Sequence, residues 1–308
     1  MSTNFDNGLR ARGVPILPTL DGDAGASAFI GTVYYASTSN GSDSNNGLSP
    51  TAAKATIQAA LNETTTLKND VVFVEDGTYT ETLTMTKANV SLIGQSRYGT
   101  KIVGATDATD TLIITGNNCR ISNFSVNTYD NGSDVSDIYI NDGDGCIVAN
   151  CYFEQGQYQL EVNASDQVQV LGCLFDEAVG YGAAIYMLDS NQCAVKYCTI
   201  ASALTNHGIL HEDADDLEVA YNSGLGTDEA GTAGVGGFVA INGTDTSSRI
   251  IVHDNMVSLF AGVVVGVNGS TAVTGISAVD FADMATTAGS YMGNNSAGNT
   301  LLADNALA

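Results

Sequence analysis

The sequence predicts an all-β fold, a single-stranded right-handed parallel β-helix of about eight coils with an N-terminal capping helix. Three observations predict it. A short apolar template repeats along the body, a second apolar pair precedes each copy of the template, and turn-forming glycine, asparagine, serine and threonine are abundant. One such coil cannot bury its apolar residues alone, but stacked coils pair each strand with the coils on either side.

The repeated template has an apolar residue, a spacer, a second apolar residue and two turn-like residues, as in CIVANCYF (146–153) and VQVLGCLF (168–175). Copies of the template start 22 to 33 residues apart, which is the length of one coil. Each copy predicts a short strand. The third position of the template is apolar in every copy: Leu92, Ile121, Val148, Val170, Val195, Val219, Val252 and Ile276.

A second predicted strand precedes each template, with two apolar residues that alternate across the chain, as in Ile185/Met187. Each coil is expected to hold about three short strands, of which these are two. This alignment places His211 inward, between Met187 and Ile241 of the neighbouring coils.

The six cysteines also fall into columns, and one column holds Cys151, Cys173 and Cys198 and continues as Asn222 and Asn255. Stacked side chains point the same way, which is poor geometry for a disulfide bond. We therefore expect free, buried thiols, with disulfides between neighbouring coils as the alternative.

Three regions are expected. Residues 1–31 form an extended N-terminal arm, residues 32–281 form the β-helix, and residues 282–308 form a C-terminal cap or an oligomer contact. The capping helix is expected near residues 51–61, where an apolar helical stripe follows a proline: Ala53, Ile57, Ala60 and Leu61.

The chain is strongly acidic, with a net charge of −24 from 34 acidic and 10 basic residues. This little positive charge argues against a nucleic-acid partner, and no apolar run reaches the about 18 residues that cross a membrane. Arginines and prolines interrupt the N-terminus, so no secretion signal is expected. We also expect no cofactor.

The best candidate for catalysis is an acidic cluster in the sixth coil: His207, Glu212, Asp213, Asp215 and Asp216. Two carboxylates with a histidine could act as general acid and base on a glycosidic bond. The alternative is a solvated turn, which we favour, so no catalytic residue is assigned. Residues 130–144 are also acidic but lack the EF-hand spacing, so no metal site is assigned.

Aromatic residues keep a sugar-binding role open, because a sugar ring stacks on an aromatic face. The chain has no tryptophan but 13 tyrosines, and five of them cluster in coils three to five: Tyr139, Tyr158, Tyr181, Tyr186 and Tyr197.

The N-terminal strip NFDNGLRARGVPILPTL (residues 4–20) has no coil column to enter, and its prolines favour an extended backbone. We expect residues 1–20 to dock on a partner. The residues expected to make this contact are Phe5, Leu9, Arg10, Arg12, Pro15, Ile16, Leu17 and Pro18.

The stretch VYYASTSNGSDSNNGLSPTAAKATIQAAL (33–61), followed by DVVFVEDGTYTETLTM (70–85) and NVSLIG (89–94), resembles the opening of pectin-lyase-like β-helix proteins. That superfamily includes pectate lyases, polygalacturonases, phage tailspikes and non-catalytic virion proteins, so the resemblance implies a fold and leaves function open. The polygalacturonase motifs do not occur as a set: Asn206-His207-Gly208 and Asp215-Asp216 are isolated fragments in the wrong order.

The arm resembles the leader of tailed-phage virion proteins, through a Phe-x-Asn-Gly-Leu-x-x-Arg-Gly-x-Pro arrangement at residues 5–15. This resemblance implies a non-enzymatic structural component of a bacteriophage virion, a capsid decoration or spike-like protein. It would be made in the host cytoplasm, dock on other capsid or tail proteins and be exposed on the particle surface as a homo-oligomer, with a trimer favoured. The alternative is a glycan-binding or glycan-depolymerising β-helix protein that acts on host surface polysaccharide.

Overall fold

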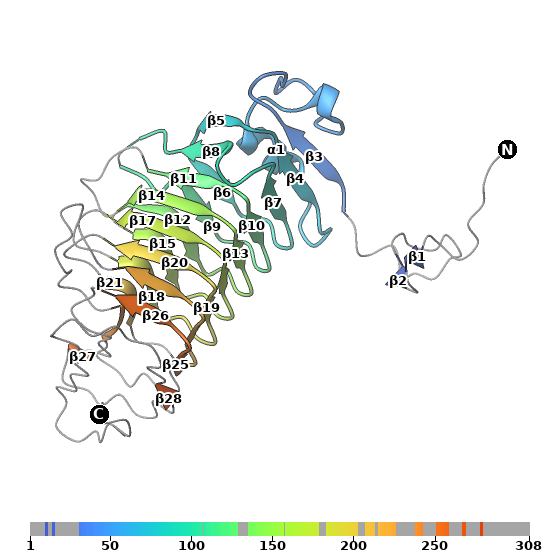
Figure 1. Cartoon of the computed structure of the whole chain (residues 1–308). Helices are drawn as coiled ribbons and strands as arrows, with labels where there is room; N and C mark the ends of the chain where they lie inside the picture. Colours follow the sequence, from blue (N-terminus) through green and yellow to red (C-terminus); the bar gives the residue numbers. More distant parts are fainter. Residues whose placement is uncertain are drawn as a thin grey trace.

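The computed structural model describes residues 31–258, except residues 107, 129–134, 157, 179–182, 203–206, 213–214, 226–237 and 243–250, together with four two-residue strands outside that range. Three parallel sheets, here called B, C and D, run along a rod (Figure 1). The predicted all-β class, a right-handed parallel β-helix, is confirmed. No helix among the described residues is long and apolar enough to span a membrane.

Sheet B is built from the predicted template. Its ten strands, in spatial order, are β28 (Ala278–Val279), β25 (Ile251–His253), β22 (Glu218–Ala220), β19 (Ala194–Lys196), β16 (Gln169–Leu171), β13 (Ile147–Ala149), β10 (Arg120–Ser122), β7 (Ser91–Gly94), β4 (Val71–Val74) and β3 (Val33–Ala36).

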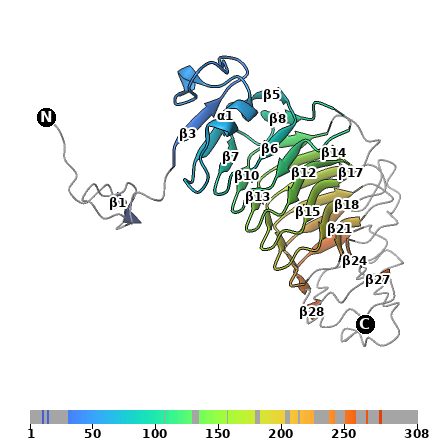
Figure 2. The same cartoon turned by 180° about the vertical axis from the view of Figure 1, so that it is seen from behind.

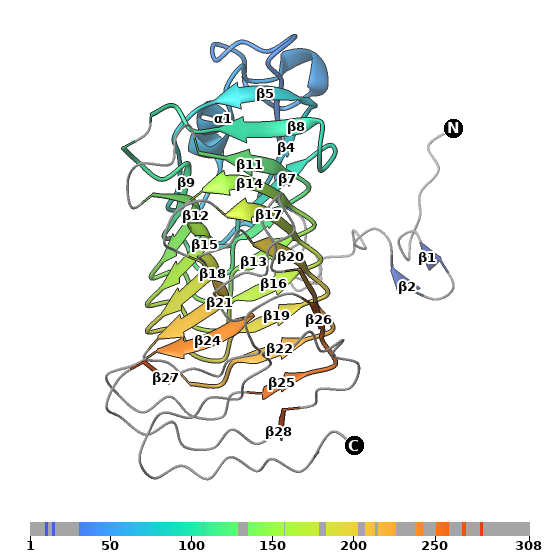
Figure 3. The ribbon, with the colours of Figure 1, turned by 60° about the vertical axis from the view of Figure 1, so that its left-hand side comes forward.

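Sheets C and D complete each coil, and Figure 3 shows their strands stacked along the rod. Sheet C contains β26 (Met256–Ser258), β23 (Ser223–Leu225), β20 (Thr199–Ser202), β17 (Leu174–Ala178), β14 (Tyr152–Gly156), β11 (Ser125–Asn127), β8 (Thr100–Val103) and β5 (Gly77–Thr80). Sheet D contains β27 (Val267–Asn268), β24 (Val239–Asn242), β21 (His207–Glu212), β18 (Ala183–Leu188), β15 (Tyr158–Asn163), β12 (Ser136–Asn141), β9 (Leu112–Ile114) and β6 (Leu83–Met85).

The predicted template column is a true column of the structure from Leu92 to Val252, each residue pairing with the same position one coil on. These side chains are buried in the core of the rod. The last predicted position, Ile276, is wrong, because Val252 pairs with Val279. The surrounding TGISAVDF offers two apolar residues that each follow a small one, so the pattern alone did not distinguish them.

Like residues stack on like in the core because the register repeats. Phe153 and Phe175 are register partners in sheet C, and their rings stack with centroids 4.7 Å apart and planes 2° from parallel. Both rings are fully buried. Burial of each ring stabilises the fold by about 2–3 kcal/mol.

The column of cysteines ends in two buried asparagines that bond along it. Asn222 Oδ1 accepts a hydrogen bond from the Cys198 N–H at 2.8 Å, and its Nδ2 donates to Asn255 Oδ1 and to the Val195 carbonyl, each at 2.9 Å. Asn255 Nδ2 in turn donates to the Val219 carbonyl at 2.9 Å. Each amide thus satisfies backbone groups of its neighbours that the core shields from water.

All six cysteines are buried free thiols, as the column argument predicts. Burial raises the pKa of the Cys193 thiol to about 11 and raises that of Cys151 well above its usual range. These sulfurs therefore remain protonated and behave as small apolar side chains of the core.

The predicted capping helix exists but is shorter and begins later than residues 51–61. A 3₁₀ turn, η1 (Pro50–Ala52), is separated from the helix α1 (Ile57–Glu63) by extended backbone. Thr56 caps α1, and Asp43 Oδ1 accepts hydrogen bonds from the N–H groups of residues 55 and 56 at 2.9 and 3.0 Å. A distant loop thus fixes the start of the helix, and the sequence near Pro50 gave no sign of it.

The extended stretch before α1 covers the outer edge of sheet B. Lys54 forms a parallel bridge with Ala36 of β3, and its N–H donates to the Tyr35 carbonyl at 2.8 Å. The Lys54 side chain is buried and forms an ion pair with Glu63 at 2.7 Å. Figure 1 shows α1 at this end of the rod, where it closes the core.

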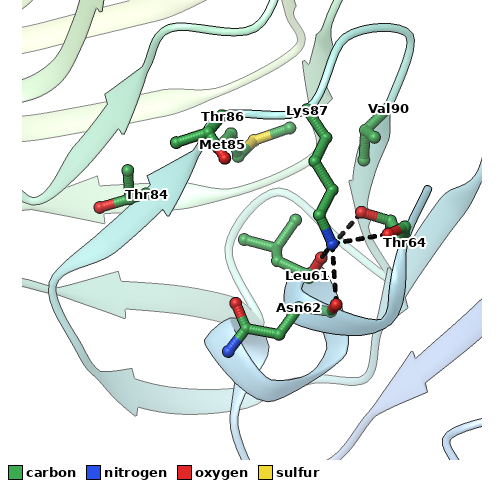
Figure 4. Close-up of a pocket in the computed structure, with 8 residues that line it drawn as sticks. All are labelled: Leu61, Asn62, Thr64, Thr84, Met85, Thr86, Lys87 and Val90. Carbon is green, nitrogen blue, oxygen red and sulfur yellow. Dashed lines mark hydrogen bonds between the residues drawn. The ribbon is translucent and has the colours of Figure 1, made fainter. Parts of the chain in front are cut away.

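Lys87 closes the C-terminal end of α1 (Figure 4). Its Nζ donates to the carbonyl oxygens of Leu61, Asn62 and Thr64 at 3.3, 2.7 and 2.6 Å. The last carbonyls of a helix have no partner within the helix and carry partial negative charge, so a cation stabilises them. The small pocket between α1 and β6 therefore contains a structural cation that is already engaged.

His211 points inward, as predicted, and is 0% exposed between its register partners Met187 and Ile241. Neither ring nitrogen has a hydrogen-bond partner in the structure. Burial lowers the pKa of His211 to about 4, so the ring is neutral at pH 7.

Much of the predicted arm lies outside the described residues, including Phe5, Leu9, Arg12, Ile16, Leu17 and Pro18, and so does the predicted C-terminal segment 282–308. The described part of the arm is an antiparallel pair, β1 (Arg10–Ala11) and β2 (Val14–Pro15), in which Arg10 lies opposite Pro15.

Replacing Lys87 by methionine should destabilise the fold by about 1.5–3 kcal/mol, because three helix carbonyls lose a charged donor. The control is Lys101→Met, which removes an exposed lysine of β8 and should change stability by less than about 0.5 kcal/mol. Urea denaturation measures both. Equal stability of the two variants would contradict the capping role.

Replacing His211 by methionine, the residue in the same column at Met187, should remove a pH dependence of stability. The folded-state pKa of about 4 lies below the ordinary 6.5, so only the unfolded chain binds this proton as the pH falls between those values. The contribution is fully present above pH 6.5 and decreases by about 3 kcal/mol towards pH 4.

This difference is measured by urea denaturation of wild type and His211→Met between pH 4 and pH 7. The control is Met187→Leu, which changes the neighbouring residue of the same buried column without altering an ionisable group and should keep the wild-type pH dependence. If wild type and His211→Met have parallel pH profiles, the buried neutral histidine does not contribute as described.

Candidate functional site

The predicted acidic cluster does not form one compact site. His207 begins β21 and Glu212 ends it, so about 16 Å of extended chain separates them. Asp215 and Asp216 lie in the turn before β22, and Asp213 lies outside the described residues. The residues of this cluster are therefore close in sequence but spread along a strand and the following turn.

The acidic turns between sheets D and B have a structural role. The Asp215 N–H donates to Asn191 Oδ1 at 2.8 Å, and the Asn191 N–H donates to Asp166 Oδ1 at 2.8 Å. The Asp166 N–H donates to Asp144 Oδ1 at 2.9 Å, one coil further back. These side chains satisfy the backbone of the next turn along the rod. No group of three or more histidine, cysteine, aspartate or glutamate residues in the described part could hold a metal ion.

A different set of residues comes together on the outer face of sheet D. We call it the tyrosine–carboxylate face, and it consists of Tyr139, Tyr158, Glu161, Tyr186 and Glu212, all partly exposed. They come from β12, β15, β18 and β21, which lie side by side along the rod in Figure 2. Tyr139, Glu161 and Tyr186 are register partners in three consecutive coils.

Two of these tyrosines stack on each other. The ring centroids of Tyr158 and Tyr186 are 4.9 Å apart and their planes differ by 25°. Tyr139 lies nearby in the same face, and its Oη accepts a hydrogen bond from Asn163 Nδ2 at 3.0 Å. The rings are thereby held in place and present partly exposed apolar surface.

Each carboxylate of the face is held by a hydroxyl group. The Tyr186 hydroxyl donates to Glu212 Oε2 at 2.5 Å, and the Ser136 hydroxyl donates to Glu161 Oε2 at 2.6 Å. These short bonds fix the direction in which the remaining lone pairs of the two carboxyl groups point. Burial, followed by the hydrogen bond to Glu212 and its negative charge, raises the pKa of Tyr186, so this hydroxyl remains a donor.

The charge of the face is negative. Its four strands read SDIYIN, YQLEVN, AAIYML and HGILHE and contain no lysine or arginine. Asp137 of β12 is fully buried, so its carboxyl group is not part of the exposed face, and burial raises its pKa well above the usual range. The face therefore disfavours anionic ligands.

Aromatic rings beside oriented hydrogen-bonding groups suit a ligand that has both apolar and hydroxyl-bearing faces, which describes a sugar. Of the five tyrosines that the sequence grouped, the structure brings together Tyr139, Tyr158 and Tyr186. Tyr197 lies elsewhere, at the turn after β19, and Tyr181 is outside the described residues. Glu161 is not among the predicted site residues, because its only signal in the sequence is its alignment with Tyr139 and Tyr186.

No protein-family model matches the sequence, and no curated protein matches it. Solved structures do match. A pectin methylesterase from carrot superposes with a TM-score of 0.56 and 9% identity, covering 86% of this chain and 87% of that chain. The pectin methylesterase PemA from Erwinia chrysanthemi superposes with a TM-score of 0.50 and 13% identity, covering 77% and 80%. At these identities the likeness concerns the fold alone, a right-handed parallel β-helix that this chain shares with both enzymes.

Proposed function

We propose that this protein binds a neutral glycan through the tyrosine–carboxylate face. The observation that carries the proposal is the stacked pair Tyr158–Tyr186, with Glu161 and Glu212 beside it. The rings supply stacking area, and the carboxylates and Asn163 supply partners for sugar hydroxyl groups. All of them project from a rigid sheet, so little conformational entropy is lost on binding.

Charge selects the kind of glycan. The chain carries a net charge of −24, and the face adds two carboxylates without a lysine or arginine on its strands. A polyuronate would meet repulsion here, whereas a neutral glycan would not. The two solved structures described above are pectin methylesterases by name. A polyuronate therefore serves as the negative control for this face.

The hydrogen bonds favour binding over cleavage. A glycosidase needs one carboxylic acid that is protonated and a second carboxylate placed across the scissile bond. Here Glu161 accepts a short hydrogen bond from the Ser136 hydroxyl and Glu212 accepts one from the Tyr186 hydroxyl, so both carboxyl groups act as acceptors within the face. Acceptor oxygens held in this way suit the hydroxyl groups of a bound glycan.

Binding is tested with the full chain on an array of neutral oligosaccharides that includes cellohexaose and maltohexaose, followed by titration calorimetry of the ligands found. In competition with a bound neutral ligand, which reports on this face alone, hexagalacturonate should be at least tenfold weaker than the neutral ligand itself. Tyr186→Ala should lower affinity about tenfold by removing the stack and releasing Glu212, and Tyr186→Phe should lower it less. The control is Tyr98→Ala, an exposed tyrosine that packs on Tyr152 in sheet C.

Equal affinity of wild type and Tyr186→Ala, or an array without a neutral ligand, would refute the proposal. Release of new reducing ends from a bound glycan, abolished by Glu212→Gln, would replace binding by depolymerisation.

We further propose that the arm attaches the rod to a virion, as its leader sequence suggests. What supports this is that the described strands of the arm, β1 and β2, pair with each other and belong to none of the three sheets of the rod. Deletion of residues 1–20 should leave a soluble, β-rich protein that no longer joins the particle, which sedimentation of assembled particles would show. Retained incorporation would refute the anchoring role, and light scattering of the full chain tests the expected trimer.

A further inference from the structure

The edge between sheets B and C carries a ladder of residues in left-handed backbone conformation. One such residue follows each strand of sheet B from β10 to β25: Asn123 (φ 64°), Asn150 (52°), Gly172 (62°), Tyr197 (58°), Tyr221 (59°) and Asp254 (52°). Asparagine, aspartate and glycine adopt this conformation readily. A tyrosine does not, so two consecutive tyrosines in the ladder are unusual.

Both tyrosines are also exposed, Tyr197 by 64% and Tyr221 by 49%. Their rings stack with centroids 5.3 Å apart and planes 7° from parallel. Because the rings are exposed, their burial contributes too little free energy to offset the unfavourable left-handed backbone. The stability of the fold therefore does not explain why tyrosine occupies these two positions. Backbone strain under an exposed aromatic pair points to a binding role.

One face of Tyr197 is left open. Tyr221, one coil further on, covers the opposite face of the ring. One coil back, the same position of the ladder is Gly172, where an added Cβ would meet no atom within 4 Å. Because Gly172 has no side chain, the face of the Tyr197 ring that points towards it is not covered by the ladder.

Arg97 borders this open position. Its Nε donates to the Asn150 carbonyl at 3.1 Å, and its Nη2 donates to the Gly172 carbonyl at 2.6 Å and to Asn150 Oδ1. Among the described residues no carboxylate forms an ion pair with Arg97. In a chain with 34 acidic and 10 basic residues, a guanidinium bonded only to amide oxygens remains available to an anion.

We propose that this open position binds one sugar ring that carries a carboxylate, with the ring stacked on Tyr197 and the carboxylate on Arg97. Asn150 and Tyr197 are two coils apart, about 9.6 Å. A ring at about 3.5–4 Å from Tyr197 leaves about 5–6 Å below Asn150. This space admits a charge-assisted hydrogen bond of about 2.8 Å from the guanidinium.

The far end of the tyrosine pair does not offer an equivalent site. Asp254 follows Tyr221 in the ladder, and its negative charge raises the pKa of the Tyr221 hydroxyl. An anionic ring would be repelled there. The site at Gly172 lies on the B–C edge, apart from the tyrosine–carboxylate face of sheet D, and it prefers the opposite charge, so it does not rest on the proposed function.

The test uses saturation-transfer and titration NMR of the full chain with methyl β-D-glucuronide and, as the matched neutral probe, methyl β-D-glucoside. The glucuronide should bind at least tenfold more tightly than the glucoside. Gly172→Asn should lower glucuronide affinity at least tenfold by filling the open position. The variant should fold normally, because asparagine already occupies this backbone conformation at Asn123 and Asn150.

Matched variants separate the contributions. Tyr197→Asn should lower glucuronide affinity about tenfold, whereas Tyr221→Asn removes only the ring on the far side and should keep affinity within about threefold of wild type. Arg97→Gln should bring the two probes to nearly equal affinity. Tyr186→Ala, on the other face, should leave glucuronide binding unchanged.

Three results would overturn the proposal. The first is that no saturation transfer to the glucuronide is seen with the wild-type protein. The second is that the Gly172→Asn variant binds the glucuronide as tightly as wild type, and the third is that the Tyr197→Asn substitution changes the molecular mass measured by light scattering. The last result would assign the exposed tyrosines to a contact between copies of the chain.

Discussion

The structure depends on one constraint, the parallel register in which each coil repeats the position of the coil before it. Backbone hydrogen bonds between coils set this register, and every side chain then lies above a residue of the same kind of position. The contacts and hydrogen-bond partners of a core residue therefore come from the neighbouring coils of its column rather than from its own coil. The asparagines show this most directly, because Asn222 and Asn255 each bond to backbone groups of the preceding coil that would otherwise be buried without a partner.

The same register operates on the surface, where no packing requirement limits the choice of residue. Residues about 25 positions apart, such as Glu161 and Tyr186, become neighbours and build a face that no local stretch of sequence contains. Sheet D presents rings with carboxylates, and the edge between sheets B and C presents rings with a guanidinium. One scaffold thus carries two aromatic surfaces, one beside two carboxyl groups and one beside a guanidinium.

The columns of the core could be read from the sequence because burial repeats with each coil. The template column to Val252, the free thiols and the inward His211 follow from that repetition. The start of α1 could not be read, because Asp43, in a loop before it, accepts the N–H groups that a longer helix would use. The site was missed for a related reason: the sequence grouped residues 207–216 as neighbours, whereas Glu212 bonds to Tyr186 of the preceding coil.

The covered edge at β3 has a consequence for assembly. A parallel rod with two bare ends could add further copies end to end, since each terminal coil is a template for the next. Here Lys54 pairs with Ala36 of β3, and α1 packs over the same end, so a strand of another copy is hindered from pairing along the outer edge of β3. Head-to-tail growth needs both ends of every copy, and one closed end is enough to prevent it. End-to-end growth into a filament is thereby disfavoured at this end of the rod.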